Sequence, residues 1–158
     1  MTMTHEEDVI NGARYRGSPM TPRATLEEFY AAFNGRDLRV MAQNWATGME
    51  ASMSNPLGGI RRGWADIQDV YRRLFDGPAR VYVEFYDYDL HASGDMFVAV
   101  GRERGEFQRG TTHVALAIRT SRIYRKIEGR WRQLHHHGSI DDPTLLEQYR
   151  TAVRHGSE

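Results

Sequence analysis

The chain has 158 residues, of which 40% are hydrophobic and 27% are charged, a balance typical of one globular domain. Its 21 basic and 21 acidic residues cancel, so no basic field favours nucleic acid as a partner. The absence of cysteine excludes disulfides and thiol nucleophiles. No apolar run reaches the roughly 20 residues that span a bilayer, and the N-terminus lacks an apolar signal core. We therefore expect a cytoplasmic protein with no membrane contact.

The first 22 residues are expected to form an arm or extended lead-in. They contain Gly12, Gly17, Pro19 and Pro22 and show little periodicity. Two interpretations stay open, a mobile tail or an arm packed on a partner subunit. Residues 23–155 are expected to form one domain.

Three helices are predicted in the first half of the chain. The first begins at Thr25, because Thr25 and Glu28 have capping-box spacing, and it ends at Asn34-Gly35. Asp37 can cap the second helix. A short strand over residues 50–54 and a Pro-containing break precede the third helix, predicted from Trp64 to Phe75.

After residue 78 the apolar period changes from that of a helix to that of a strand. Asp142-Pro143 can open a last helix. Helices grouped before antiparallel strands imply an α+β domain with one sheet face packed on the helices. The strands are expected over residues 80–92, 96–104, 112–127 and 130–140; alternation alone leaves open which face of the first turns inward.

The stretch RTSRIYRKIEGRWRQLHHHGSI, residues 119–140, resembles the hairpin of SnoaL-like proteins and kinase association domains, within the nuclear transport factor 2-like superfamily. The resemblance extends over residues 23–142. It implies a cystatin-like α+β barrel, in which a curved antiparallel sheet packs on three N-terminal helices and encloses one pocket. It also implies a homodimer formed through the outer sheet face, where Ile123 and Leu134 offer apolar area.

The residues that face one another across this hairpin follow from its turn. If Glu128-Gly129 is a two-residue loop, pairing outward places Arg122 opposite His135 and Thr120 opposite His137. Alternate residues share a face, so Tyr124 lies beside them and His136 points the opposite way. Strand geometry thus separates the three histidines, and we expect no metal site.

The resemblance implies that Arg122 points into the pocket. A neighbouring Arg lowers the pKa of a His, which favours a neutral imidazole that can act as a base. We therefore expect His135 and His137 as candidate catalytic residues, with Arg122 and Tyr124 as ligand-binding residues that hold an oxyanion. The alternative is a structural role for the two histidines.

Asn55 and Tyr30 are the remaining candidate ligand contacts. Ketosteroid isomerases of the superfamily carry a catalytic Asp before a Pro, where this chain has Asn55-Pro56. An amide cannot serve as that base, so the steroid isomerase mechanism is not expected. Asn55 could equally form an Asx turn. The first-helix tyrosine of the isomerases aligns with Phe29, and Tyr30 is the available substitute.

These features favour a protein that binds a small polar or anionic organic ligand. An enzyme of this kind would be a cofactor-independent lyase, isomerase or cyclase that uses histidine acid–base chemistry. The alternative is a non-catalytic ligand-binding or oligomeric assembly module. We expect a homodimer and no cofactor, metal, nucleic acid or membrane partner.

Overall fold

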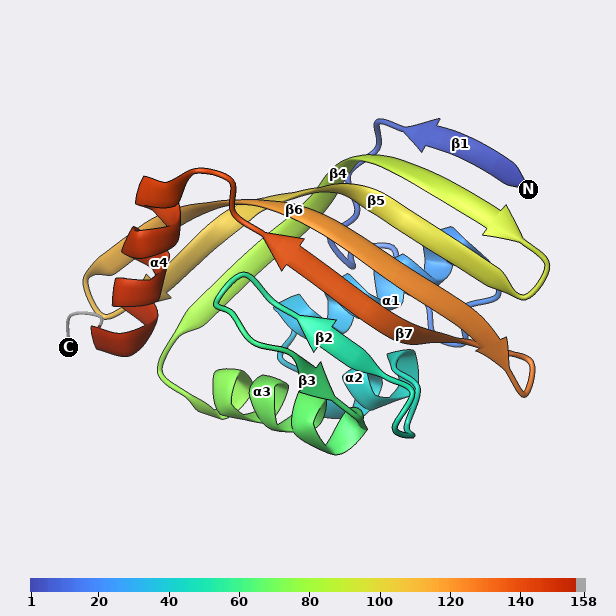
Figure 1. Ribbon diagram of the computed structural model, residues 1–158, viewed down its shortest axis with the longest axis horizontal. Coiled ribbons are helices and arrows are strands. Elements are labelled where there is room, and N and C mark those ends of the chain that lie inside the picture. The colour runs from blue at the N-terminus through green and yellow to red at the C-terminus, as the bar shows by residue number, and fades with distance from the viewer. Residues whose placement is uncertain (156–158) are drawn as a thin grey trace.

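The structure, a computed structural model, describes residues 1–155 and consists of one curved sheet with four helices (Figure 1). The seven strands follow the order β1-β4-β5-β6-β7-β2-β3. The predicted antiparallel meander is formed by β4 to β7, whereas β2 pairs in parallel with β7. The strands are β1 (Thr2–Glu6), β2 (Ser52–Ser54), β3 (Arg61–Arg62), β4 (Arg80–Ser93), β5 (Met96–Arg109), β6 (Thr112–Ile127) and β7 (Arg130–Ser139).

The first three helices lie on one side of the sheet, and the fourth lies beside the end of the β5–β6 hairpin (Figure 1). This arrangement confirms the predicted α+β class. No helix within residues 1–155 is long and apolar enough to cross a membrane. The helices are α1 (Pro22–Asn34), α2 (Leu38–Asn44), α3 (Trp64–Asp76) and α4 (Pro143–His155).

The helix starts are determined by side-chain caps. Asp37 caps α2 through Val40 N at 3.0 Å, and Asp142 accepts a bond from Thr144 N at 2.9 Å, as predicted. The expected start of α1 at Thr25 was wrong. Thr21 accepts a bond from Ala24 N and is the cap, and Pro22 starts the helix.

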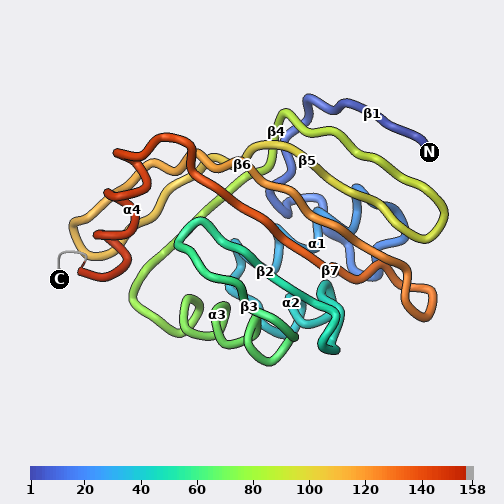
Figure 2. The backbone as a smooth tube through the Cα atoms, in the orientation of Figure 1, coloured from blue at the N-terminus to red at the C-terminus, as the bar shows by residue number. Residues whose placement is uncertain are grey.

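The N-terminal segment lies along the edge of the sheet (Figure 2). β1 pairs with the end of β4, and Ile10 exchanges two backbone hydrogen bonds of 2.8 Å with Phe85. The buried carboxylate of Glu27 accepts a bond from Gly12 N at 3.0 Å. In the described residues this segment is therefore bound to its own domain.

A β-bulge decides which face of β4 turns inward. Val81, Val83 and Phe85 are buried, and the register shifts between Tyr86 and Asp89. Asp87 takes a positive φ of 48° within the bulge. The extra residue brings Tyr88 to the buried face, although plain alternation would place it outside.

β5 is longer than predicted because the glycine-containing segment after Arg104 stays in the sheet. A Cβ at Gly105 would lie only 1.8 Å from the carbonyl oxygen of Tyr82. A residue with a side chain would force the two strands apart at this position. Glycine therefore allows β4 and β5 to pair closely as far as Gln108, which lies opposite Arg80.

Candidate functional site

A cavity of about 540 Å³, here called the inner cavity, lies between the concave sheet face and α1, α3, α4 and the loop at residues 55–58. Its volume falls in the usual range for small-molecule sites. Most of the wall is apolar, with Phe29 of α1, Leu74 of α3 and Ile118 of β6 as examples. The polar groups in this wall are consequently the candidate functional groups.

Arg122 of β6 is the most deeply buried charge in the wall, with 2% of its surface exposed. Its Nη1 donates to Gln133 Oε1 at 2.9 Å, and its Nε donates to Tyr30 Oη at 3.4 Å. The guanidinium carbon lies 3.6 Å from the ring centroid of Phe29, a cation–π contact. These contacts fix the guanidinium at the wall of the cavity, which agrees with the predicted inward orientation of Arg122.

Glu103 of β5 supplies the opposite charge. Its Oε2 lies 3.5 Å from Arg122 Nη2, and its other oxygen accepts a hydrogen bond from the Thr120 hydroxyl. Burial acts to lower the pKa of Arg122, but Tyr30 and Glu103 outweigh it and raise that pKa, so the guanidinium stays charged. The wall thus contains a buried ion pair with no net charge.

Glu103 was not among the candidate site residues predicted from the sequence, although its position in the apolar pattern of β5 indicates a buried carboxylate. On β5, the alternating positions Phe97, Ala99 and Phe107 are buried. Glu103 has the same parity, so it is a carboxylate on an apolar stripe. Such a residue needs a buried partner, and Arg122 is that partner.

The predicted pairing of the β6–β7 hairpin was wrong beyond Tyr124. Tyr124 pairs with Gln133 as expected, but Ile123 pairs with His135 and Arg122 with His136. Leu134 is the extra residue of a β-bulge. A one-residue shift exchanges the faces of a strand, so His136 points inward and joins the wall of the inner cavity.

The His136 imidazole is neutral near pH 7. Burial, together with the positive charge of Arg122, lowers its pKa well below the ordinary value. Its Nδ1 is buried and has no hydrogen-bond partner among the described residues. A Cβ at Gly138 would lie 3.1 Å from His136 Nε2, so glycine there leaves space for the ring.

The two histidines predicted as catalytic lie on the outer face, and neither lines the inner cavity. His135 Nδ1 is 2.7 Å from Ser52 Oγ, which connects β7 to β2. His137 is exposed, and its ring centroid lies 6.4 Å from that of His135. Within residues 1–155, no three His, Asp or Glu side chains are grouped to hold a metal ion.

The other predicted ligand contacts take different positions. Asn55 lines the inner cavity, and its side-chain oxygen accepts a bond from Leu57 N at 3.0 Å, an Asx turn. Tyr30 and Tyr124 are fully buried outside the lining. Tyr30 contacts Arg122, whereas the Tyr124 hydroxyl donates to Asn44 Oδ1 at 2.8 Å.

Asn44 connects the cavity wall to the surface of the domain. Its Oδ1 also accepts a bond from Gln133 Nε2 at 3.2 Å, and its Nδ2 donates to Glu28 at 3.1 Å. Glu28 in turn lies 2.6 Å from Arg130 Nη2. Gln133 is thereby held at both ends of its amide, which orients the oxygen that accepts from Arg122.

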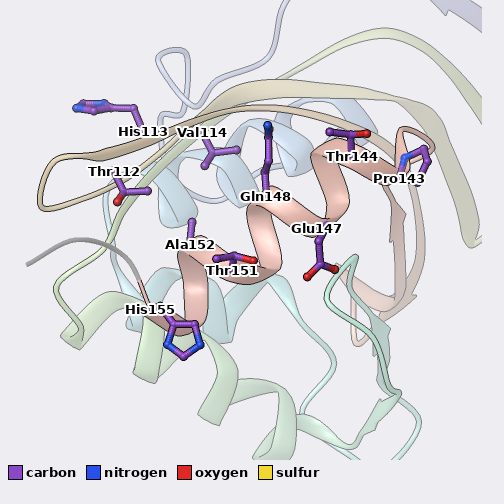
Figure 3. Close-up of a pocket in the computed structure, with 10 residues that line it drawn as sticks. All are labelled: Thr112, His113, Val114, Pro143, Thr144, Glu147, Gln148, Thr151, Ala152 and His155. Carbon is purple, nitrogen blue, oxygen red and sulfur yellow. The ribbon is translucent and has the colours of Figure 1, made fainter.

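A second hollow, the α4 groove, lies between α4 and the start of β6 (Figure 3). Its volume is about 860 Å³, larger than that of the inner cavity. The ionisable residues that line it, His113, Glu147 and His155, are all exposed. Because the described residues that line it include no buried charged group, the α4 groove is a weaker candidate for a specific site.

Comparison with known proteins agrees with this architecture. The family model described as a SnoaL-like domain matches residues 23–143. The chain belongs to the SnoaL-like family. No curated protein gives a significant match.

Solved structures with this fold include proteins with different descriptions. A candidate calcium/calmodulin-dependent protein kinase type II association domain from Thiobacillus denitrificans is 27% identical, with a TM-score of 0.60, and the match covers 77% of this chain and 98% of that one. A candidate dehydratase of the nuclear transport factor 2-like family from Streptomyces avermitilis is 18% identical, with a TM-score of 0.64 and coverages of 73% and 89%. A nuclear transport factor 2-like protein from Salmonella enterica is 21% identical, with a TM-score of 0.66 and coverages of 73% and 84%.

Proposed function

We propose that this SnoaL-like protein binds a small, largely apolar organic molecule in the inner cavity and that an uncharged polar group of the molecule meets His136 and Arg122. The observation that carries the proposal is the buried Nδ1 of His136, which has no hydrogen-bond partner among the described residues and belongs to a residue in the wall of a mostly apolar cavity. A buried polar atom without a partner costs about 1–3 kcal/mol. A ligand hydroxyl, amide or carbonyl group that satisfies the imidazole removes this cost.

The charge balance of the wall favours an uncharged group at this end of the ligand. Arg122 is already compensated by Glu103, and His136 is neutral. An anion placed there would add a third charge to a buried pair. Its desolvation free energy would not be offset, because Arg122 is already paired. A carbonyl oxygen can accept from the guanidinium at a much smaller cost.

The same observations favour binding over proton abstraction. A general base is most effective when its pKa lies near the working pH. The pKa of His136 is lowered well below 6.5 by burial and by Arg122, which makes the imidazole a weak base. We therefore place ligand binding first and treat turnover as the second candidate function.

Thermal-shift titration of uncharged aromatic ketones, lactones and hydroxylated aromatics tests this proposal. A compound at about 100 times its Kd adds roughly 2.7 kcal/mol, or a few degrees in Tm. We expect His136→Gln to reduce the shift given by wild-type binders, because the imidazole contact is lost. His137→Gln changes the adjacent histidine on the outer face and is the matched control. Equal shifts in wild type and both variants would contradict the role of His136.

We also propose that the chain forms a homodimer through the outer sheet face. No helix of the described residues covers this face (Figure 1). Val100 and Tyr82 are more than 40% exposed there, and Ile123 of the same face is half-buried, whereas Leu134 packs against the buried core. Exposed apolar and aromatic residues on an uncovered sheet face are typical of an interface, although here they alternate with ion pairs such as Arg104–Glu84. This arrangement supports the assembly alternative without opposing ligand binding, because the cavity lies on the other side of the sheet.

A further inference from the structure

The inner cavity has many more positive than negative side chains. Arg61, Arg73, Arg109 and Arg122 line it, and Glu103 is the single carboxylate of the lining. Since Glu103 is paired with Arg122, the remaining charge is positive and comes from the three outer arginines. These three belong to β3, α3 and β5, so separate elements bring positive charge to the wall of a mostly apolar space.

The mouth of the cavity is marked by an adjoining hollow. This hollow of about 420 Å³ is lined by Arg150 and Arg154 and shares Leu57 and Val153 with the inner cavity. The cavity therefore opens between the loop at residues 55–58 and α4. A Cβ at Gly58 would lie 4.0 Å from Arg150 Nη2, which places that guanidinium against the loop.

The arginines of the inner cavity and the adjoining hollow differ in whether they have an interaction partner. Arg73 pairs with Asp69 at 3.6 Å, Arg154 with Glu147 at 3.9 Å, and Arg109 donates to the Val153 carbonyl. Among residues 1–155, neither Arg61 nor Arg150 has an ion-pair partner. Arg150 also lies beyond the region that the family model matches, so α4 contributes to this site independently of the family pattern.

We propose that the ligand of this protein has an acidic group at its outer end, a carboxylate, sulfonate or phosphate, which Arg61 and Arg150 bind at the mouth. The inference rests on the proposed function and adds the substrate class: an organic acid with an apolar body and an uncharged polar group at the inner end. Guanidinium groups suit such anions because each can donate two parallel hydrogen bonds. A positive mouth also raises the association rate of acidic ligands.

Two fluorescent probes that share one ring system test this inference. N-phenyl-1-naphthylamine is uncharged, and 8-anilinonaphthalene-1-sulfonate adds a single sulfonate to the same rings. Both are titrated against wild type, Arg61→Ala, Arg150→Ala and the double variant. We expect wild type to bind the sulfonate more tightly than the uncharged probe. Each single substitution should weaken sulfonate binding by about two- to fivefold, as expected for partly exposed ion pairs. The affinity of the uncharged probe should stay the same.

Matched controls separate this inference from the proposed function. Arg72 lies on exposed α3 surface, does not line the cavity and pairs with Asp69, so Arg72→Ala should leave both affinities unchanged. Ile118→Trp fills the cavity and should weaken both probes. Suppose that the uncharged probe binds and that Ile118→Trp weakens its binding. The acidic-group inference is then wrong, and the proposed function stands, if the sulfonate binds no more tightly than the uncharged probe or if its higher affinity persists in the double variant. If neither probe binds, or Ile118→Trp affects neither, both proposals are wrong.

Discussion

At the residue level, the contribution of the Arg122–Glu103 ion pair to the free energy of unfolding can be measured directly by mutation. The side chains are 2% and 6% exposed, so solvent screens their attraction weakly. Each charge is tolerated because the other is present, and Gln133 and Thr120 satisfy further hydrogen-bonding positions. Removing one partner therefore leaves a buried, unpaired charge, whereas removing both partners does not.

We predict that Arg122→Met lowers the free energy of unfolding by about 3–5 kcal/mol, because it leaves the Glu103 carboxylate buried and unpaired. The double variant Arg122→Met/Glu103→Leu should be less destabilised than the sum of the two single variants. Urea denaturation of all four proteins gives the coupling free energy. Additive effects would mean that the two side chains do not interact in the folded protein.

His136 gives a prediction for the pH dependence of stability. Its folded-state pKa lies below the unfolded value of about 6.5, so below that pH the unfolded chain binds a proton that the folded chain excludes. Stability is complete above about pH 6.5 and declines as the pH falls, by up to about 1.4 kcal/mol per pH unit from this group. His136→Gln should flatten the curve between about pH 7 and 5, whereas His137→Gln should not. A slope that survives in His136→Gln would assign it to another group.

At the level of elements, α4 forms one side of the cavity mouth. Tyr149 and Val153 line the inner cavity, and the Tyr149 ring lies 5.6 Å from that of Phe107 on β5. Burial raises the pKa of Tyr149 to about 12, so the phenol is uncharged in this position. The helix thus contributes apolar surface to a wall whose other parts come from α1, α3 and the sheet.

We predict that Tyr149→Ala widens the mouth, lowers the free energy of unfolding by about 2–4 kcal/mol and weakens binding of the uncharged naphthylamine probe. Gln148→Ala is the matched control, because Gln148 of the same helix is exposed and lines the α4 groove instead of the inner cavity (Figure 3). Denaturation and probe titration of the two variants measure both effects. Equal behaviour of the two variants would show that α4 is not part of the site.

The sequence was informative about elements and less so about the strand faces. Periodicity located the three N-terminal helices and the four long strands, because each has an amphipathic pattern that burial requires. The two β-bulges leave no such pattern, since the position of an extra residue depends on how both strands pack. Because of the bulge at Leu134, His135 and His137 face away from the cavity and His136 faces it, the reverse of what plain alternation predicts.

At the level of the whole molecule, the sheet separates two surfaces with different chemistry. Its concave face holds the inner cavity, and its outer face holds Ile123 and Val100. A ligand site and a subunit interface can therefore coexist in one small domain. The family resemblance predicts a pocket on one face and a subunit interface on the other, and both stay predictions here.

We predict a homodimer in solution, with about twice the chain mass of 18.2 kDa in light scattering. Ile123→Glu places a charge on the outer face and should give the monomer, because an unpaired charge is costly in an apolar interface. Ile60→Glu makes the same change at an exposed loop position and should remain dimeric. A monomeric wild type at micromolar concentration would contradict the predicted interface.

The inner cavity as a ligand site is tested most directly by titrating N-phenyl-1-naphthylamine into wild type and Ile118→Trp and measuring the probe fluorescence. Ile118 faces the cavity and is half-buried, so the larger side chain can occupy the ligand's space. We predict saturable binding to wild type and at least about tenfold weaker binding to Ile118→Trp, a loss of roughly 1.4 kcal/mol. Equal affinity in the two proteins, with both folded, would show that the probe binds elsewhere and would contradict the cavity as the site.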